Sequence, residues 1–257
     1  MVAGSRVAWV TGAGSGIGEA GARTLASQGH AVVLTGRRDE ALERVASDIR
    51  MAGGTAHVQA GDVTRIVDVQ RIARWIVDTL GRIDVLVNNA GSNIPARSWS
   101  ALTPEGVDQV IGTNLSSAFY CVTAVLPIMR AQKDGLLIHT ASWAGRHPAT
   151  VSGPAYSAAK HGMIVMSHLL NAEECVNGIR SCAICPAEVA TPILDQRPRK
   201  ASAEERARML QPSDLGDLIG YVASLPPHVC LNEVVVSPTW NRMFPVVTEA
   251  EQGHEGM

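Results

Sequence analysis

Tyr156 and Lys160 stand four residues apart in "YSAAK", a stretch of small residues with helical character. On a helix, side chains at that spacing share one face and come within reach of each other. A phenol has an ordinary pKa of about 10, and a nearby ammonium group favours the phenolate form. We therefore expect Lys160 to lower the pKa of Tyr156, so that Tyr156 acts as a general acid/base. The pair alone is weak evidence, because this spacing arises by chance on many helices.

A glycine-rich loop near the N-terminus, "TGAGSGIG" at residues 11–18, follows an apolar run and precedes a helical segment. Glycine lets the backbone approach a ligand closely, and a helix N-terminus attracts phosphate. The spacing of Gly12, Gly16 and Gly18 after Thr11 departs from the common G-x-G-x-x-G pattern. It still predicts a site for the phosphates of a dinucleotide.

The end of the second apolar run carries cations where many dinucleotide-binding proteins carry a carboxylate for the adenosine ribose. Gly36 is followed by Arg37 and Arg38. Guanidinium groups suit a 2′-phosphate, so the sequence favours NADP(H) as the cofactor. Asp39 and Glu40 come next and leave NAD(H) open.

Short apolar runs alternate with helical segments along the chain, which predicts a parallel sheet covered on both faces. The expected strands are "RVAWVTG", "HAVVLTG", "AHVQAGDV", "IDVLVNNAG", "LLIHTAS", "IRSCAIC" and "EVVVS", and the expected helices are 19–27, 39–51, 66–80, 104–132, 154–177 and 213–224. The predicted fold class is α/β, a Rossmann-like three-layer αβα sandwich with about seven strands. We expect a single catalytic domain over residues 1–247, a substrate lid near 191–214, and a frayed tail over 248–257.

Composition limits the choice of partners. The chain has 257 residues, 46% of them hydrophobic, and a formal net charge of −2, which offers no broad basic surface for nucleic acid. No signal peptide is evident, and polar residues and Pro127 interrupt the apolar stretch 113–129, so we expect no membrane span and a cytoplasmic location. The expected partners are a small molecule and further copies of the chain.

Five cysteines are scattered along the chain, and two of them, Cys182 and Cys185, form a C-x-x-C pattern inside a predicted strand. Residues three apart on a strand face opposite sides of the sheet. We therefore expect no metal site there and reduced, buried thiols.

Six stretches, in this order, resemble the short-chain dehydrogenase/reductase family from Thr11 to about Phe244: "TGAGSGIG", "GDV", "NNAG", "GTNLSSAF", "HTAS" and "YSAAK". The resemblance implies a catalytic set of Asn114, Ser142, Tyr156 and Lys160. In it, Ser142 orients the substrate oxygen, Lys160 also holds the nicotinamide ribose, and Asn114 holds a water that passes the proton onward. The implied cofactor contacts are Gly12, Ser15, Gly16, Ile17, Gly18, Arg37, Asp62, Val63, Asn89, Ala90, Tyr156, Lys160, Pro186, Val189 and Thr191.

The chain departs from the family pattern in three places. Ala187 stands where glycine is usual, and the segment between Ser142 and Tyr156 is about one residue longer than is common. The end carries Pro238 and Trp240 in place of a glycine-rich turn, which bears on the family's usual homodimer or homotetramer. Five residues are expected near the mouth of the pocket or on the lid: Trp99, Trp143, His147, Met209 and Leu210. If they face the pocket, an apolar or cyclic substrate is favoured over a highly charged one.

These motifs together predict an NAD(P)-dependent oxidoreductase that interconverts a ketone or aldehyde and an alcohol by a Tyr-Lys-Ser-Asn proton relay. Two other functions stay open: a non-catalytic dinucleotide-binding sensor, and an epimerase or dehydratase of the same superfamily. A methyltransferase on a similar sheet would account for the first glycine loop but not for the later motifs.

Overall fold

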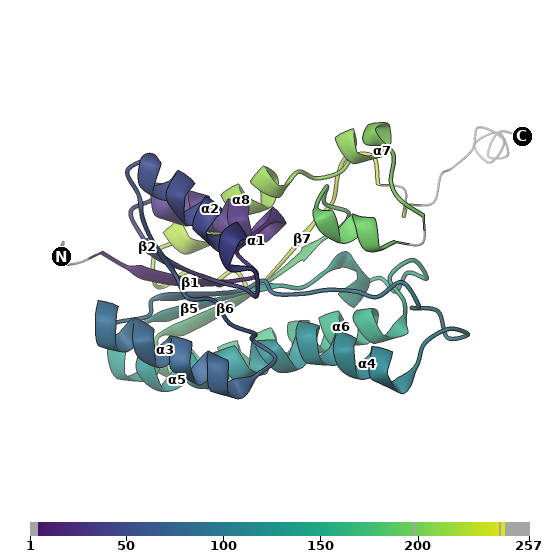
Figure 1. The fold of residues 1–257 in the computed structure, drawn as a ribbon. Coiled ribbons are helices and arrows are strands. Elements are labelled where there is room, and N and C mark those ends of the chain that lie inside the picture. The colour runs from purple at the N-terminus through teal and green to yellow at the C-terminus, as the bar shows by residue number, and fades with distance from the viewer. Residues whose placement is uncertain (1–4, 198, 242, 245–257) are drawn as a thin grey trace, which may run out of the picture.

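The computed structural model describes residues 5–197, 199–241, 243 and 244. Its centre is one parallel sheet of seven strands in the order β3-β2-β1-β4-β5-β6-β7 (Figure 1). Runs of valine, leucine and isoleucine form these strands because both faces of the sheet are covered. The predicted fold class is confirmed. The strands are β1 Val7–Thr11, β2 Ala31–Thr35, β3 Thr55–Val58, β4 Val85–Asn88, β5 Gly135–Thr140, β6 Ile179–Pro186 and β7 Glu233–Val236.

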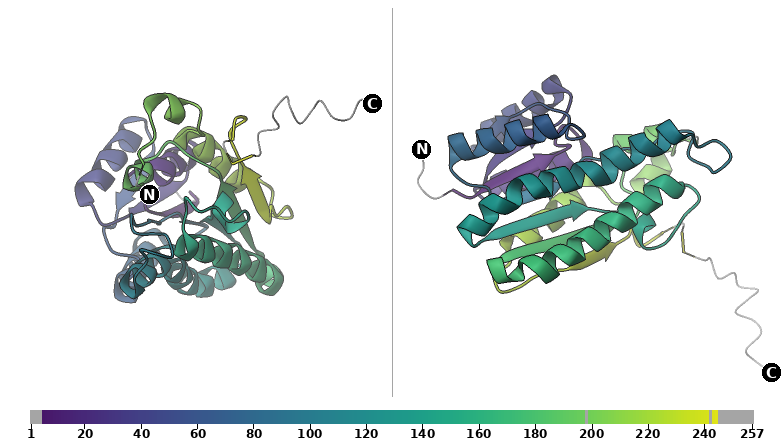
Figure 2. Two further views of the ribbon diagram at one scale, coloured as in Figure 1. Left: turned by 90° about the vertical axis from the view of Figure 1, so that its right-hand side faces the viewer. Right: turned by 90° about the horizontal axis from the view of Figure 1, so that it is seen from below.

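Helices form a layer on each face of the sheet. One layer consists of α1 (Gly16–Ser27), α2 (Asp39–Met51) and α8 (Pro212–Ser224), and the other of α3 (Ile66–Leu80), α4 (Pro104–Ile111), α5 (Ser117–Gln132) and α6 (Pro154–Glu174). Seen from below, α3, α5 and α6 lie side by side across the sheet (Figure 2). Each layer encloses its own apolar core, so the sheet is held rigidly between them.

Strand β6 shows how the two cores are separated. Cys182 packs in the core beneath α1 and α8, whereas Cys185 packs in the core beneath α5 and α6. The prediction that these two side chains face opposite sides of the sheet is confirmed. Burial raises the pKa of each thiol to about 12, which keeps both protonated at neutral pH.

The helical run Pro104–Gln132 is the one candidate membrane span in the described part of the chain, on length and apolar composition alone. In the fold, α5 packs on β4, β5 and α3 through Val122, Val125 and Met129. Between α4 and α5 the backbone makes a π-helical turn, Gly112–Ser116, which the sequence did not predict.

The segment between β6 and α8 contains the short helices Pro192–Gln196 and α7 (Ala203–Ala207). A single β-bridge joins Val189 to Leu210 and closes the segment into a loop over the end of the sheet. Because α8 starts at Pro212, the last residues of the expected 191–214 lid belong to a core helix. The expected 248–257 tail lies outside the described residues.

Candidate active site

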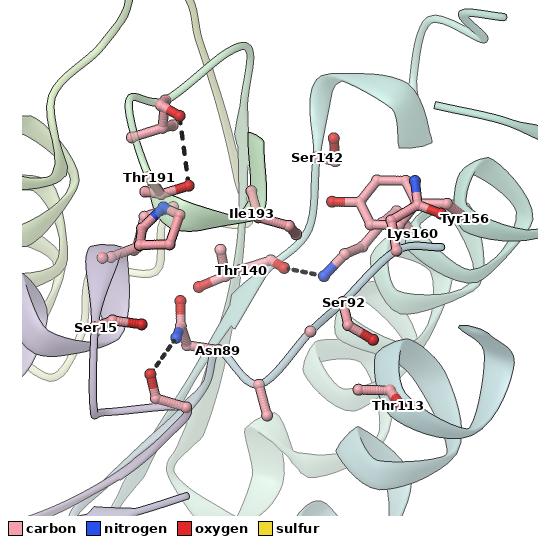
Figure 3. A pocket seen from close by; sticks show the side chains of 18 of the residues that line it. Ser15, Asn89, Ser92, Thr113, Thr140, Ser142, Tyr156, Lys160, Thr191 and Ile193 are labelled. Carbon is pink, nitrogen blue, oxygen red and sulfur yellow. Dashed lines mark hydrogen bonds between the residues drawn. The ribbon is translucent and has the colours of Figure 1, made fainter. Parts of the chain in front are cut away.

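A cavity of about 370 Å³ opens at the carboxyl ends of the strands. At this edge the connection after β1 runs to β2 on one side, whereas the connection after the neighbouring β4 runs to β5 on the other, and such reversal points bind ligands in open α/β sheets. Figure 3 shows Ser15, Asn89 and Thr191 on one side and Ser142, Tyr156 and Lys160 on the other. The predicted site residues that line the cavity are Gly12, Ser15, Gly16, Ile17, Arg37, Asp62, Val63, Asn89, Ala90, Ser142, Tyr156, Lys160, Pro186, Val189 and Thr191.

The glycine loop between β1 and α1 requires glycine at specific positions. Gly12 and Gly16 have φ of +63° and +59°, the left-handed region that side chains disfavour. Gly18 does not line the cavity; a Cβ there would lie 2.4 Å from the Gly12 carbonyl oxygen. Gly18 therefore lets α1 pack closely on the loop rather than contacting a ligand.

Thr11, the last residue of β1, fixes the neighbouring "NNAG" turn. Its buried hydroxyl accepts hydrogen bonds from the backbone N–H groups of Asn89 and Ala90, each 3.0 Å away, and donates to the Val87 carbonyl at 3.2 Å. The Asn89 side-chain amide donates to the carbonyls of Thr11 and Gly12. Asn89 thus reaches the cavity while its amide nitrogen ties the two loops together.

The far end of the cavity, next to the C-terminus of β2, is cationic. Arg37 and Arg38 are exposed there, and neither forms an ion pair within the described residues. The Asp62 carboxylate accepts from the backbone and the hydroxyl of Thr64, which shapes the turn after β3. A second phosphate group would meet two guanidinium groups at this end.

The predicted catalytic pair, Tyr156 and Lys160, lies on the first two turns of α6, which starts after Gly153 (φ +76°). The buried Lys160 Nζ donates to the Thr140 carbonyl at 2.7 Å and lies 5.7 Å from the centre of the Tyr156 ring. Burial lowers the pKa of Lys160 to about 8. Helical spacing brings the pair together as predicted.

The predicted direction of the Tyr156 pKa is wrong for the protein alone. Burial raises the pKa of this phenol, and the opposing influences are a hydrogen bond with Ser142 and the positive charges of Arg197 and Arg97. Desolvation of a phenolate outweighs these favourable contacts. The groups that favour the phenolate thus include two arginines, Arg97 and Arg197, that no sequence motif singles out.

Ser142 follows β5 and caps a short 3₁₀ turn, where its hydroxyl oxygen accepts from the Ala144 N–H at 3.1 Å. It lines the same end of the cavity as Tyr156. This position allows the hydroxyl to contact both the phenol and a substrate oxygen.

Asn114 is fully buried in the π-helical turn and does not line the cavity. Its amide nitrogen donates to the Ser92 and Val110 carbonyls at 2.7 and 2.8 Å, and its Oδ1 accepts from the Ser92 N–H. A Cβ on Gly91 would lie 2.8 Å from that Oδ1 and 3.5 Å from Lys160 Nζ. The side chain of Asn114 thus positions the loop that passes in front of Lys160.

Several expected pocket residues lie elsewhere. Trp143 lines the cavity and stacks on His147 with ring centres 4.4 Å apart, but His147 itself is not part of the wall. Trp99 is 82% exposed, and Met209 and Leu210 are buried outside the cavity lining.

Sequence reasoning missed two arginines at the Tyr156 end. Arg97, in the loop after β4, is buried and donates to the carbonyls of Ile94 and Val151. Arg197 forms an ion pair with Glu188. Both arginines line the cavity, and neither stands in a motif or a periodic segment that would have marked it.

A phosphorylated dinucleotide fits these residues. The glycine loop lines the cavity with backbone in a conformation that side chains disfavour at Gly12 and Gly16, and Arg37 and Arg38 supply cations at one end. In the middle, the buried Thr140 hydroxyl lines the cavity and has no hydrogen-bond partner among the described residues. A buried hydroxyl without a partner is costly, and a ligand hydroxyl or amide would satisfy it.

Comparison with known proteins agrees with this geometry. The family model described as short chain dehydrogenase matches residues 6–202. A Streptomyces virginiae protein assigned as a ketoacyl reductase of a monensin polyketide synthase is 40% identical over 86% of this chain and 90% of its own length.

Two solved structures superpose closely. One is a metagenomic short-chain oxidoreductase in complex with NADP, with a TM-score of 0.79 and 32% identity, covering 92% of this chain and 98% of its own. The other is a variant of actinorhodin polyketide ketoreductase with NADPH, with a TM-score of 0.83 and 30% identity, covering 90% of this chain and 95% of its own.

Proposed function

This chain belongs to the short-chain dehydrogenase family of NAD(P)-dependent oxidoreductases, and on that premise we propose that it interconverts a ketone or aldehyde and an alcohol with NADP(H). The observation that carries the proposal is one cavity with the glycine loop and Arg37 at one end and Tyr156, Lys160 and Ser142 at the other. Relatives named as ketoreductases, one of them with NADPH, support both the reaction and the cofactor.

The cofactor's binding groups would be divided along the cavity. Backbone N–H groups at the start of α1 receive the phosphates, and Arg37 and Arg38 receive the additional 2′-phosphate. Lys160 and Thr140 take the hydroxyls of the nicotinamide ribose. When bound, the nicotinamide supplies or accepts the hydride.

The proton is moved by this chain's own side chains. Ser142 donates a hydrogen bond to the substrate oxygen, and Tyr156 gives its phenolic proton to that oxygen in reduction and takes it back in oxidation. Because burial raises the pKa of Tyr156, the phenol is protonated at neutral pH, which suits a proton donor for reduction. Lys160, tied to the Thr140 carbonyl, keeps its position beside the ring.

The segment 192–211 is proposed as a lid, because Ile193, Leu194 and Arg197 reach the cavity from it.

We also propose a homodimer or homotetramer, since Phe119 of α5 and Val165 and Leu169 of α6 expose apolar side chains on one helical layer. Light scattering on the purified protein measures that assembly directly.

The decisive experiment for the reaction is Tyr156→Phe. We expect turnover of a carbonyl panel to fall by about 100- to 10,000-fold, the contribution of a general acid/base group. NADP(H) should still raise the melting temperature, because the glycine loop is intact. Turnover within a factor of ten of the unaltered enzyme would refute the assignment.

Cofactor preference rests on the two exposed arginines. Arg37→Gln combined with Arg38→Gln should weaken NADP(H) by about 100-fold, while NAD(H) affinity stays within a factor of three. Titration of protein fluorescence with each cofactor measures this difference. Equal losses for the two cofactors would refute recognition of the 2′-phosphate.

A further inference from the structure

The substrate end of the cavity contains more positive charge than proton transfer requires. Arg97 and Arg197 come from loops 100 residues apart in the sequence, yet both line the cavity and both act electrostatically on the Tyr156 phenol. Burial and the proximity of Arg197 lower the pKa of Arg97. Glu188, which pairs with Arg197, lines the same cavity, so these three side chains together carry one net positive charge in a partly dehydrated place, an arrangement that an anion stabilises.

The same two arginines also line a second cavity, of about 350 Å³, next to the first. Arg199 and Lys200 add two exposed cations to its wall, and Glu205, which pairs with Arg199 at 2.5 Å, is its one acidic residue in the described part of the chain. The wall of the second cavity is therefore predominantly cationic.

Both guanidinium groups are fixed in position rather than mobile. Arg97 is held by the Ile94 and Val151 carbonyls, at 2.7 and 3.2 Å from Nε and Nη1. Arg197 is held by Glu188, whose side chain is 7% exposed. A guanidinium group that is already ordered loses little entropy when it forms one further charge-assisted hydrogen bond with a carboxylate.

We infer that the substrate is a keto acid or hydroxy acid whose carboxylate is bound by Arg97 and Arg197 while its carbonyl or hydroxyl carbon lies beside Tyr156. The inference rests on the proposed function and names the substrate class. It replaces the expectation of an apolar or cyclic substrate. That expectation depended on five residues facing the pocket, and of these only Trp143 lines the cavity.

The test compares β-, γ- and δ-keto acids with their methyl esters, which keep the ketone and remove the charge. For the best acid we expect kcat/KM to exceed that of its ester by at least about tenfold, the range of a charge-assisted hydrogen bond. Added salt should lower kcat/KM for the acid and leave that for the ester nearly unchanged. An ester turned over as well as its acid in every pair would overturn the inference.

Two variants localise the effect. The first is Arg97→Gln. The second combines Arg197→Gln with Glu188→Gln, so that no buried charge loses its partner. Each should bring the acid-to-ester ratio of kcat/KM close to one. Arg97→Lys should restore part of the ratio, and Arg74→Gln, on the exposed face of α3, should leave it unchanged. Because acid and ester are compared within each variant, general damage to the enzyme cancels. A ratio that survives both charge removals would also overturn the inference.

Failure of the reaction itself is distinguishable. If the carbonyl panel is turned over but neither keto acids nor their esters are, the inference is overturned and the proposed function stands. If nothing is turned over, the proposed function fails, and the inference is then decided by melting temperatures measured with NADP(H) and either the acid or the ester. A shift with acids alone, lost in Arg97→Gln, supports the anion site. Equal shifts with acids and esters, or no shift with either, overturn it.

Discussion

Thr11 offers a sharp test of how the cofactor cavity is built. Its side chain is 1% exposed, and its hydroxyl forms three hydrogen bonds that join β1 to β4 and to the turn after it. Thr11→Val keeps the shape and the branched side chain but leaves the N–H groups of Asn89 and Ala90 and the Val87 carbonyl without this partner. At about 1 kcal/mol for each lost bond, we expect a destabilisation of about 3 kcal/mol.

Thr11→Ser is the matched control, because it keeps the hydroxyl and removes one methyl group, at a cost of about 1 kcal/mol. Urea unfolding measures both variants, and titration with NADP(H) measures the site. We expect the valine variant alone to bind the cofactor about tenfold more weakly, since its "NNAG" turn is no longer held. If the two variants match in stability and in cofactor affinity, the hydroxyl does not organise the cavity.

Three further predictions concern other parts of the chain. Gly18→Ala places a methyl group 2.4 Å from a backbone carbonyl oxygen and should weaken cofactor binding by more than about tenfold, whereas Gly29→Ala, with open space around it, should alter stability alone; cofactor titration separates them. Burial holds the pKa of His139 at about 3, against about 6.5 when unfolded, so the unfolded chain takes up the extra proton in acid and stability falls as pH drops below 6.5. Between pH 7 and pH 4.5, the free energy of unfolding measured in urea should therefore fall by about 3 kcal/mol less in His139→Gln than in the unaltered protein. Equal falls in the two proteins would exclude this residue as the cause. A thiol reagent should modify the exposed Cys175 within minutes and leave Cys121, whose pKa burial raises to about 12, unmodified until the chain unfolds; mass spectrometry of the native protein distinguishes the two.

The regular parts of the fold could be predicted because they depend on local periodicity. The helices 39–51 and 66–80 begin and end as expected, since their apolar spacing is strong and uninterrupted. The first helix begins at Gly16, three residues before the predicted start at Glu19, because glycine in a turn and glycine in a first helical turn look alike in sequence. The π-helical turn at Gly112–Ser116 was missed, because one inserted residue barely alters a helical pattern.

The site was predictable where residues follow strand ends, and not where long loops return to it. Asn89 comes directly after β4 and Ser142 two residues after the end of β5, so their place follows from the sheet. Arg97 and Arg197 reach Tyr156 only through the folding of irregular segments, for which no period exists. The direction of the Tyr156 pKa was missed for a related reason: spacing reveals a neighbouring charge, whereas desolvation depends on everything packed around the phenol.

The strand order has a consequence for how this protein is made. Pairing β1 with β4 joins Ala8 to Val85, and the cavity also needs Arg197, so its walls come together only after most of the chain has left the ribosome. Contacts this distant in sequence form slowly, because each closes a long loop. Dinucleotide binding should therefore appear as a late event in refolding, after the secondary structure, and would serve as a signal that folding is complete.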